Sequence, residues 1–239
     1  MAHSPNSRII KFADDTTLTG LISDDDESGY RNEVDLLVKW CTENNLILNA
    51  EKTRELIVEF RKNKNPKDPL FINGAIVKQV RDFKLLGTYV MDNLTWKLNT
   101  DEILKKGRQR LFFLRTLKAY GVRKNILIQF YRAIIESILS SNILVWFGRL
   151  SQNDLSRLES VIRSAQRIIG ADLSSLHSLY QERTLKRIKC ILNDDSHPAF
   201  DYIQFLPSGN RLRTFRGSNR LTNSSYPSAV KIYNAHHTR

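Results

Sequence analysis

The spacing of apolar residues changes character near residue 100 of this 239-residue chain. Before that point apolar residues form short runs between polar turns, a pattern typical of β-strands. Beyond it they recur every three or four residues, as they do on the buried face of an α-helix. The expected strands cover 8–12, 16–22, 56–60, 70–72, 75–80 and 83–92. The expected helices cover 31–44, 101–119, 124–146, 155–169 and 173–192.

Turn and cap residues support this division. Asn73-Gly74 predicts a tight hairpin, because both residues tolerate a positive φ. Ser151 to Asp154 offers a helix cap. From His197 the chain is rich in Pro, Gly, Asn, Ser and Arg, so we expect an irregular tail with a short helix near 229–234. The chain therefore reads as α+β: antiparallel hairpins plus a helix, then a helical bundle, then the tail.

Charge separates the same two parts. Residues 1–100 are nearly neutral, whereas residues 101–239 hold 23 Lys and Arg against 10 Asp and Glu. This excess favours a polyanionic partner such as nucleic acid, with a merely solvated basic surface as the alternative. Cys41 and Cys190 lie far apart without zinc spacing, which is typical of a reduced intracellular protein, nuclear or cytoplasmic. No apolar run is long enough to span a membrane, so we expect no membrane partner.

Two acidic groups in the first part are candidate metal ligands. Asp14-Asp15 lies between the first two strands, where aspartate is also an ordinary turn residue. The run Asp24 to Glu27 precedes a helix, and we interpret it as a solvated helix start rather than a metal cluster, because acids complement the positive end of the helix dipole.

Several motifs occur in a specific order. Phe12-Ala13-Asp14-Asp15 has an aromatic-x-Asp-Asp form and is followed by "WCTENNLILNAEKTRELIVEF", "FKLLGTYVMDNLTW" and the basic run "ILKKGRQRLFFLRTLKAYG". In this order the chain resembles the C-terminal part of non-LTR (LINE; jockey, CR1 and L2 type) retrotransposon reverse transcriptases. The resemblance implies the end of a polymerase palm over 1–66, primer-grip-like hairpins over 67–100, a helical thumb over 101–192 and a basic tail over 193–239.

The resemblance also implies roles for individual residues. Asp14 would be the Mg²⁺ ligand, Asp15 would lie near the primer terminus, and Lys52 would lie near the incoming triphosphate. Primer positioning would fall to Phe83, Leu86 and Gly87. The RNA or DNA template–primer would be followed by Lys105, Lys106, Arg108, Arg110, Arg115 and Lys118.

One departure from the reverse transcriptase pattern concerns activity. The first catalytic aspartate and the fingers of these enzymes precede the hairpin, but here only "MAHSPNSRII" does, and it holds no acid. A two-metal site with half its ligands binds Mg²⁺ weakly. We therefore expect a truncated RNA-directed DNA polymerase (nucleotidyltransferase) remnant that binds no Mg²⁺, lacks its N-terminal polymerase part and is inactive alone.

Two other functions stay open. The basic helices could form a nonenzymatic nucleic-acid-binding module that needs neither Asp14 nor Asp15. The stretch from Arg110 to Leu139 also resembles the N-terminal segment of an AlkB-homologue tRNA-modifying protein, which implies a helical interaction segment. Hydroxylase or methyltransferase chemistry does not follow, because the sequence holds neither an iron-binding His-x-Asp motif nor a glycine-rich methyl-donor loop.

Overall fold

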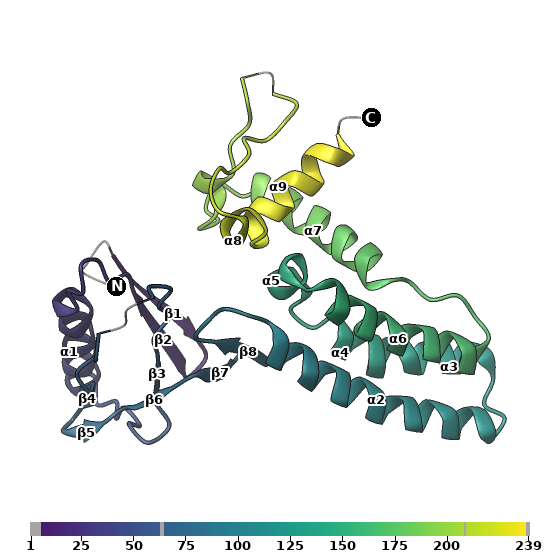
Figure 1. Ribbon diagram of the computed structural model, residues 1–239, viewed down its shortest axis with the longest axis horizontal. Coiled ribbons are helices and arrows are strands. Elements are labelled where there is room, and N and C mark those ends of the chain that lie inside the picture. The colour runs from purple at the N-terminus through teal and green to yellow at the C-terminus, as the bar shows by residue number, and fades with distance from the viewer. Residues whose placement is uncertain (1–5, 63–64, 208, 238–239) are drawn as a thin grey trace. The chain divides into compact units, whose positions relative to one another are not determined.

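The computed structural model describes residues 6–62, 65–207 and 209–237, and it separates the chain into two compact units (Figure 1). Unit 1 runs to Phe83 and includes Met91–Leu94, and unit 2 comprises Lys84–Val90 and Thr95–Arg239. Helices combine with small sheets, so the general α+β class is confirmed. The finer division into four domains stays a prediction. None of the helices in the described ranges is both long and apolar enough to cross a membrane.

Unit 1 consists of short strands and one helix. Its elements, with the hairpin that continues into unit 2, are β1 (Ser7–Phe12), β2 (Asp15–Gly20), α1 (Ser28–Glu43), β3 (Arg54–Leu56), β4 (Phe71–Ile72), β5 (Ala75–Ile76), β6 (Lys78–Val80), β7 (Asp82–Leu85) and β8 (Thr88–Met91). The pairs β1–β2 and β4–β5 are antiparallel, β3 pairs in parallel with β6, and β7 pairs with β8. The core of unit 1 is small, because its buried cluster among the described residues consists of Val34, Leu70, Ile72 and Val77.

Turn residues account for two of these hairpins. Asn73 and Gly74 have φ values of 50° and 78° between β4 and β5, as expected for a turn with two positive φ angles. The single strand expected over 83–92 is wrong, because the chain folds back at Leu86 and Gly87 with φ values of 45° and 86°. Strand β3 ends at Leu56 rather than Phe60, since its partner β6 is itself only three residues long.

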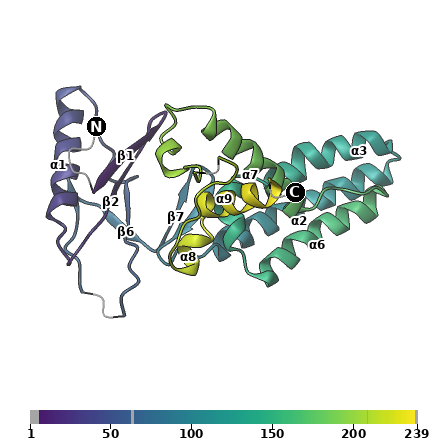
Figure 2. The same cartoon turned by 90° about the horizontal axis from the view of Figure 1, so that it is seen from above.

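Unit 2 is a helical bundle. Its helices are α2 (Lys97–Ala119), α3 (Lys124–Phe130), the π-helix η1 (Tyr131–Glu136), α4 (Ser137–Leu139), α5 (Ile143–Trp146), the 3₁₀ turn η2 (Phe147–Arg149), α6 (Gln152–Ile169), α7 (Leu176–Leu192), the 3₁₀ turn η3 (Phe200–Tyr202), α8 (Asn219–Thr222) and α9 (Ser225–His236). Helices α2, α3 and α6 contact one another, and α7 contacts α9 (Figures 1 and 2). The tail is thus more helical than expected, since α9 helps to cover a second core of unit 2.

The main core of unit 2 explains this packing. Its fully buried side chains include Leu104, Leu114, Leu127, Tyr131, Ile135, Leu139, Leu158 and Ile162. Gly107 lies in the middle of α2, where an added Cβ would lie 3.3 Å from Leu139 and 3.4 Å from Val161. The absence of a side chain at Gly107 therefore lets α2 approach α4 and α6 closely.

The helix expected over 124–146 is interrupted twice. The backbone changes from α to π geometry at Tyr131, and the chain then reverses at Asn142, whose φ is 49°. The reversal is held by the Trp146 indole N–H, which donates to the Ser141 carbonyl at 2.8 Å. The expected cap of the next helix is confirmed, since the Ser151 hydroxyl accepts the Asp154 N–H at 3.0 Å.

Tyr131 offers a test of this packing, because its buried hydroxyl has no hydrogen-bond partner within the described part of the chain. Leaving a buried polar group unpaired costs about 1–3 kcal/mol. Tyr131→Phe should therefore raise the free energy of unfolding of unit 2 by about 1 kcal/mol, measured by urea unfolding followed at 222 nm. The control Tyr120→Phe should change nothing, since Tyr120 is 83% exposed. A destabilised Tyr131→Phe variant would contradict this account.

Candidate functional site

The outward face of α2 carries a row of basic residues. One side of this helix is buried in the core and carries Leu104, Leu111 and Leu114. Lys105, Arg108, Phe112 and Arg115 follow one another at intervals of three or four residues and are all exposed. Because an α-helix has 3.6 residues per turn, these four side chains lie on one stripe away from the buried face. We call these four residues the α2 stripe.

The cations of the α2 stripe are not neutralised by any acidic side chain that the structure describes. Within the described ranges, no acidic side chain forms an ion pair with Lys105, Arg108 or Arg115. Arg157 of α6 behaves differently, because it contacts Asp101 at 2.6 Å and Asp154 at 2.9 Å. The positive field of the stripe is therefore available to an external anion.

The stripe contains half of the nucleic-acid-binding residues expected from the sequence. Lys106 and Arg110 lie on the other flank of α2 and are partly buried, and Lys118 is exposed near the end of this helix. Of the six expected cations, the stripe therefore contains Lys105, Arg108 and Arg115.

An aromatic pair on α2 escaped the sequence analysis. Phe112 and Phe113 are 63% and 51% exposed, and their rings meet edge to face at 5.7 Å. The available signal was their position between Leu111 and Leu114, which already occupy the buried face of the helix. Two further apolar residues at that point cannot also face the core. They therefore add exposed aromatic rings to the surface of α2.

The residues expected to act in polymerase chemistry lie on exposed turns and strands. Asp14 is in the turn of the β1–β2 hairpin, Asp15 begins β2, and Lys52 is in a turn where its N–H donates to Asn49. Phe83 is exposed on β7, and the other two primer-positioning residues form the turn after this strand. In the part of the chain that the structure describes, no group of three or more His, Cys, Asp or Glu side chains could hold a metal ion.

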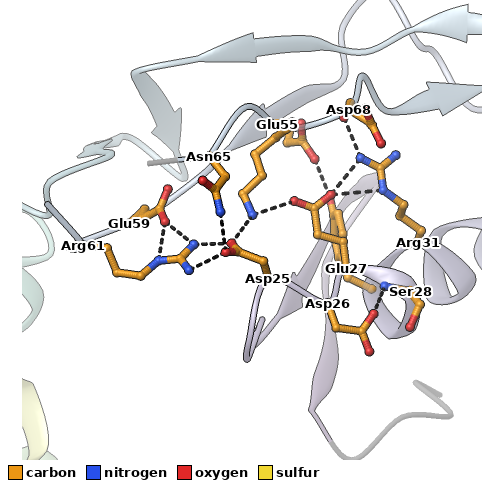
Figure 3. Close-up of polar contacts among 12 residues, drawn as sticks. Asp25, Asp26, Glu27, Ser28, Arg31, Glu55, Glu59, Arg61, Asn65 and Asp68 are labelled. Carbon is orange, nitrogen blue, oxygen red and sulfur yellow. Dashed lines mark hydrogen bonds and ion pairs between the residues drawn. The ribbon is translucent and has the colours of Figure 1, made fainter. Parts of the chain in front are cut away.

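The acidic run before α1 forms an ion-pair network (Figure 3). The Asp25 carboxylate accepts hydrogen bonds from Arg61 at 2.6 Å, from Asn65 at 2.8 Å and from Lys67 at 2.8 Å. Glu27 accepts from Lys67 at 3.1 Å and from Arg31 at 2.8 Å. The interpretation of residues 24–27 as a solvated helix start is therefore incomplete, since two of these acids tie Arg61, Asn65 and Lys67 to the segment where α1 begins.

The electrostatics of this network follow from its contacts. The Arg61 guanidinium, aided by Lys67, holds the pKa of the Asp25 carboxyl well below its ordinary value of 3.8. Asp26 has a different role, since its pKa is lowered by a hydrogen bond with the Ser28 side chain and by the Ser28 N–H, which its carboxylate accepts at 2.9 Å where α1 begins. Arg61 and Lys67 form ion pairs with acidic side chains of unit 1. The cations of the α2 stripe have no such acidic partner within the described ranges.

Comparison with known families finds a similarity inside unit 2. The model of the family described as "Alkylated DNA repair protein alkB homolog 8, N-terminal" matches residues 96–137. The matched segment spans α2, α3 and the π-helix, and includes the α2 stripe. It covers less than a fifth of the chain, so it describes that segment and not the whole protein. No curated protein and no solved structure matches the chain.

This comparison corrects the resemblance to retrotransposon reverse transcriptases. The matching family belongs to an AlkB homologue, and no comparison supports a reverse transcriptase, a palm or a thumb. The polymerase roles of Asp14, Asp15, Lys52, Phe83, Leu86 and Gly87, and the template–primer as partner, depended on that resemblance and lose their basis. The resemblance of residues 110–139 to an AlkB-homologue segment is the better supported interpretation.

Removing the central acid of the network should release the loop of residues 61–67. Asp25→Asn leaves Arg61 and Lys67 without their shared carboxylate, so trypsin should cleave after Arg61 or Lys62 several-fold faster than in the wild-type protein. Asp35→Asn is the matched control, because this exposed acid of α1 lies outside the network. Equal cleavage of both variants would show that the ion pairs do not hold the loop.

The pH dependence of Asp25 has a defined sign. A carboxyl whose pKa is lowered by folding stabilises the folded state above its unfolded pKa, and this contribution is lost as the pH falls through the folded pKa. Asp25 should therefore still be ionised at pH 3, below the ordinary value of 3.8, as read from the ¹³C chemical shift of its carboxyl carbon. Titration of Asp25 near its ordinary value would show that the network does not persist in solution.

Proposed function

We propose that unit 2 is a nonenzymatic helical interaction module that binds nucleic acid through the α2 stripe. The carrying observation is the row of exposed, unpaired cations at Lys105, Arg108 and Arg115. This row lies inside the segment that is similar to the AlkB homolog 8 N-terminal family, whose description places that family in the context of DNA. The proposal involves no covalent step.

The charge of the whole segment supports a polyanionic partner. Residues 96–137 hold ten Lys and Arg against three Asp and Glu. Lys105 and Arg115 are ten residues apart, which is about 15 Å along a helix at 1.5 Å per residue. One strand of a duplex presents about four phosphates over that length, at about 3.4 Å of helix axis per phosphate, and an extended single strand presents fewer. The stripe is thus long enough to contact several phosphates at once.

The exposed aromatic rings favour a single strand over a duplex. Phe112 lies between Arg108 and Arg115 on the stripe, and Phe113 lies beside it. Aromatic side chains stack on bases that are free of a duplex, while neighbouring Lys and Arg contact the backbone. A duplex hides its base faces and would leave both rings in water.

A protein partner is the second candidate. The specific observation in its favour is the size of the apolar surface that Phe112 and Phe113 expose together, since exposed apolar patches often mark protein contacts. The two candidates differ in salt dependence, because only a nucleic acid releases condensed counterions when it is bound.

The test is fluorescence anisotropy with a labelled 20-nucleotide single strand and the matching duplex, between 50 and 300 mM salt. The single strand should bind more tightly, and its affinity should fall steeply with salt. The triple change of Lys105, Arg108 and Arg115 to Gln should reduce the slope of log K against log salt by about 2–3, since each lost phosphate contact removes about 0.7–0.9.

The control changes three exposed cations of unit 2 outside the stripe, Lys186, Lys189 and Arg216, to Gln. This variant has the same net charge and should keep most of the affinity. Equal losses of affinity in both variants would show that binding depends on the net charge of unit 2 and not on the α2 stripe. Phe112→Ala should weaken binding of the single strand but not of the duplex. Absence of salt-dependent binding would reject the nucleic acid and leave the protein partner.

A further inference from the structure

A cavity of about 270 Å³ lies in unit 2 beside the turn of the β7–β8 hairpin. It is open to solvent on one side and is lined by residues of that hairpin, of the first half of α2 and of the segment that follows the π-helix. Its lining residues are Lys84, Gly87, Thr88, Tyr89, Asn99, Glu102, Ile103, Lys106, Ser137, Ile138 and Ser141. We call this cavity the hairpin pocket. It is separate from the α2 stripe, because none of the stripe residues lines it.

An unpaired buried donor belongs to a residue that lines the hairpin pocket. The Asn99 side chain is only 3% exposed, and its Oδ1 accepts the Tyr89 N–H at 3.2 Å. Its Nδ2 is buried and has no partner within the described ranges. A buried amide without an acceptor costs about 1–3 kcal/mol, so such a group calls for an explanation. Because Nδ2 has almost no accessible surface, a ligand oxygen in the hairpin pocket would meet this donor only after a shift of the pocket wall.

The walls of the hairpin pocket are held by specific hydrogen bonds. The Asn142 side chain donates to the Leu86 carbonyl at 3.1 Å and to the Thr88 hydroxyl at 2.8 Å. This contact joins the hairpin turn to the reversal after α4. Because the Thr88 hydroxyl accepts from Asn142, its own proton is left for another acceptor. The pocket is therefore braced by the fold, and the Thr88 hydroxyl keeps a proton that it can donate.

Hydrogen-bond donors dominate the lining. Lys84 and Lys106 each carry an ammonium group, that of Lys84 lying 5.8 Å from the centre of the Tyr89 ring, and Asn99, Thr88 and Ser141 can each donate a neutral hydrogen bond. Glu102 is the single acid that lines the pocket. Two lysines against one carboxylate disfavour a metal ion and favour an anion. The π-helix that ends just before Ser137 is an irregularity often found at functional sites.

We propose that the hairpin pocket binds a phosphate monoester that carries a hydroxyl-bearing group, as in a nucleotide. The phosphate oxygens accept from Lys84, Lys106 and the Asn99 amide, and Glu102 accepts from a ligand hydroxyl. A pocket of this volume suits a small ligand or the end of a chain rather than a strand passing through. The phosphate monoester could come from a free nucleotide or from the 5′ end of a nucleic acid.

The test is isothermal titration calorimetry of the full chain with adenosine 5′-monophosphate and with adenosine. The monophosphate should bind at least about tenfold more tightly, because adenosine lacks the charged group that the lysines contact. Asn99→Asp keeps an acceptor for the Tyr89 N–H but removes the free donor and repels phosphate, so binding should fall at least about tenfold. Lys84→Gln and Ser141→Ala should each weaken binding, and they test the site if Asn99→Asp does not fold.

Lys97→Gln is the matched control, since this exposed lysine begins α2 and does not line the pocket. Its affinity for adenosine 5′-monophosphate should equal that of the wild-type protein. The Gln triple variant of the α2 stripe should also keep this affinity, which separates this proposal from the proposed nucleic-acid function. Equal affinity for adenosine and its monophosphate, no binding of either, or no effect of Lys84→Gln and Ser141→Ala would overturn the proposal.

Two oligonucleotides identify the source of the phosphate. A short single strand with a 5′-phosphate is compared with the same strand ending in a 5′-hydroxyl. A preference for the phosphorylated end that Lys84→Gln abolishes supports a nucleic acid end as the ligand. Tight binding of the free monophosphate without that preference supports a free nucleotide.

Discussion

Burial of one shared apolar surface is the constraint on which unit 2 depends. Helix α2, the π-helix and α6 each place their large side chains in the same core, where Leu114, Tyr131 and Leu158 are fully buried. Because one side of α2 is committed to this core, its remaining residues must face outward. The exposed stripe of cations is thus a consequence of core packing. The cost of this close packing is visible at Tyr131, whose buried hydroxyl has no partner among the residues that the structure describes.

Two asparagines connect the hairpin to this helical core. Asn99 accepts from Tyr89, and Asn142 donates to Leu86 and Thr88, so the turn of the β7–β8 hairpin belongs to unit 2. These contacts also create the hairpin pocket at the junction. Unit 1 is held in a different way, since its buried cluster is small and the ion pairs of Asp25 and Glu27 fix its long loop. The two units therefore depend on salt and pH to different degrees.

The comparison with families shows the limits of motif order as an argument. The aromatic-x-Asp-Asp tip, the helix and the hairpin occur in the order that suggested a polymerase, and most of the expected elements exist. A hairpin with acids at its tip is also ordinary turn chemistry, and the described residues bring no further acids into a metal-binding group with Asp14. The segment with an independent family match is instead the basic α2–α3 region. Its charge and periodicity were visible in the sequence, and they support a function that requires no metal.

The sequence by itself determined α2, α6 and α7 of unit 2, the Asn73-Gly74 turn, the Ser151 cap and the basic character of α2, because each depends on local spacing or on a single residue type. It could not show that Lys105, Arg108 and Arg115 lack acidic partners while Arg61 and Lys67 have them, since those partners are distant in the chain. Only the tertiary structure decided the break at Asn142, the exposure of Phe112 and the unpaired amide of Asn99. The reason is physical: periodicity identifies which face of a helix is buried, whereas pairing and cavities depend on which other segments pack against it.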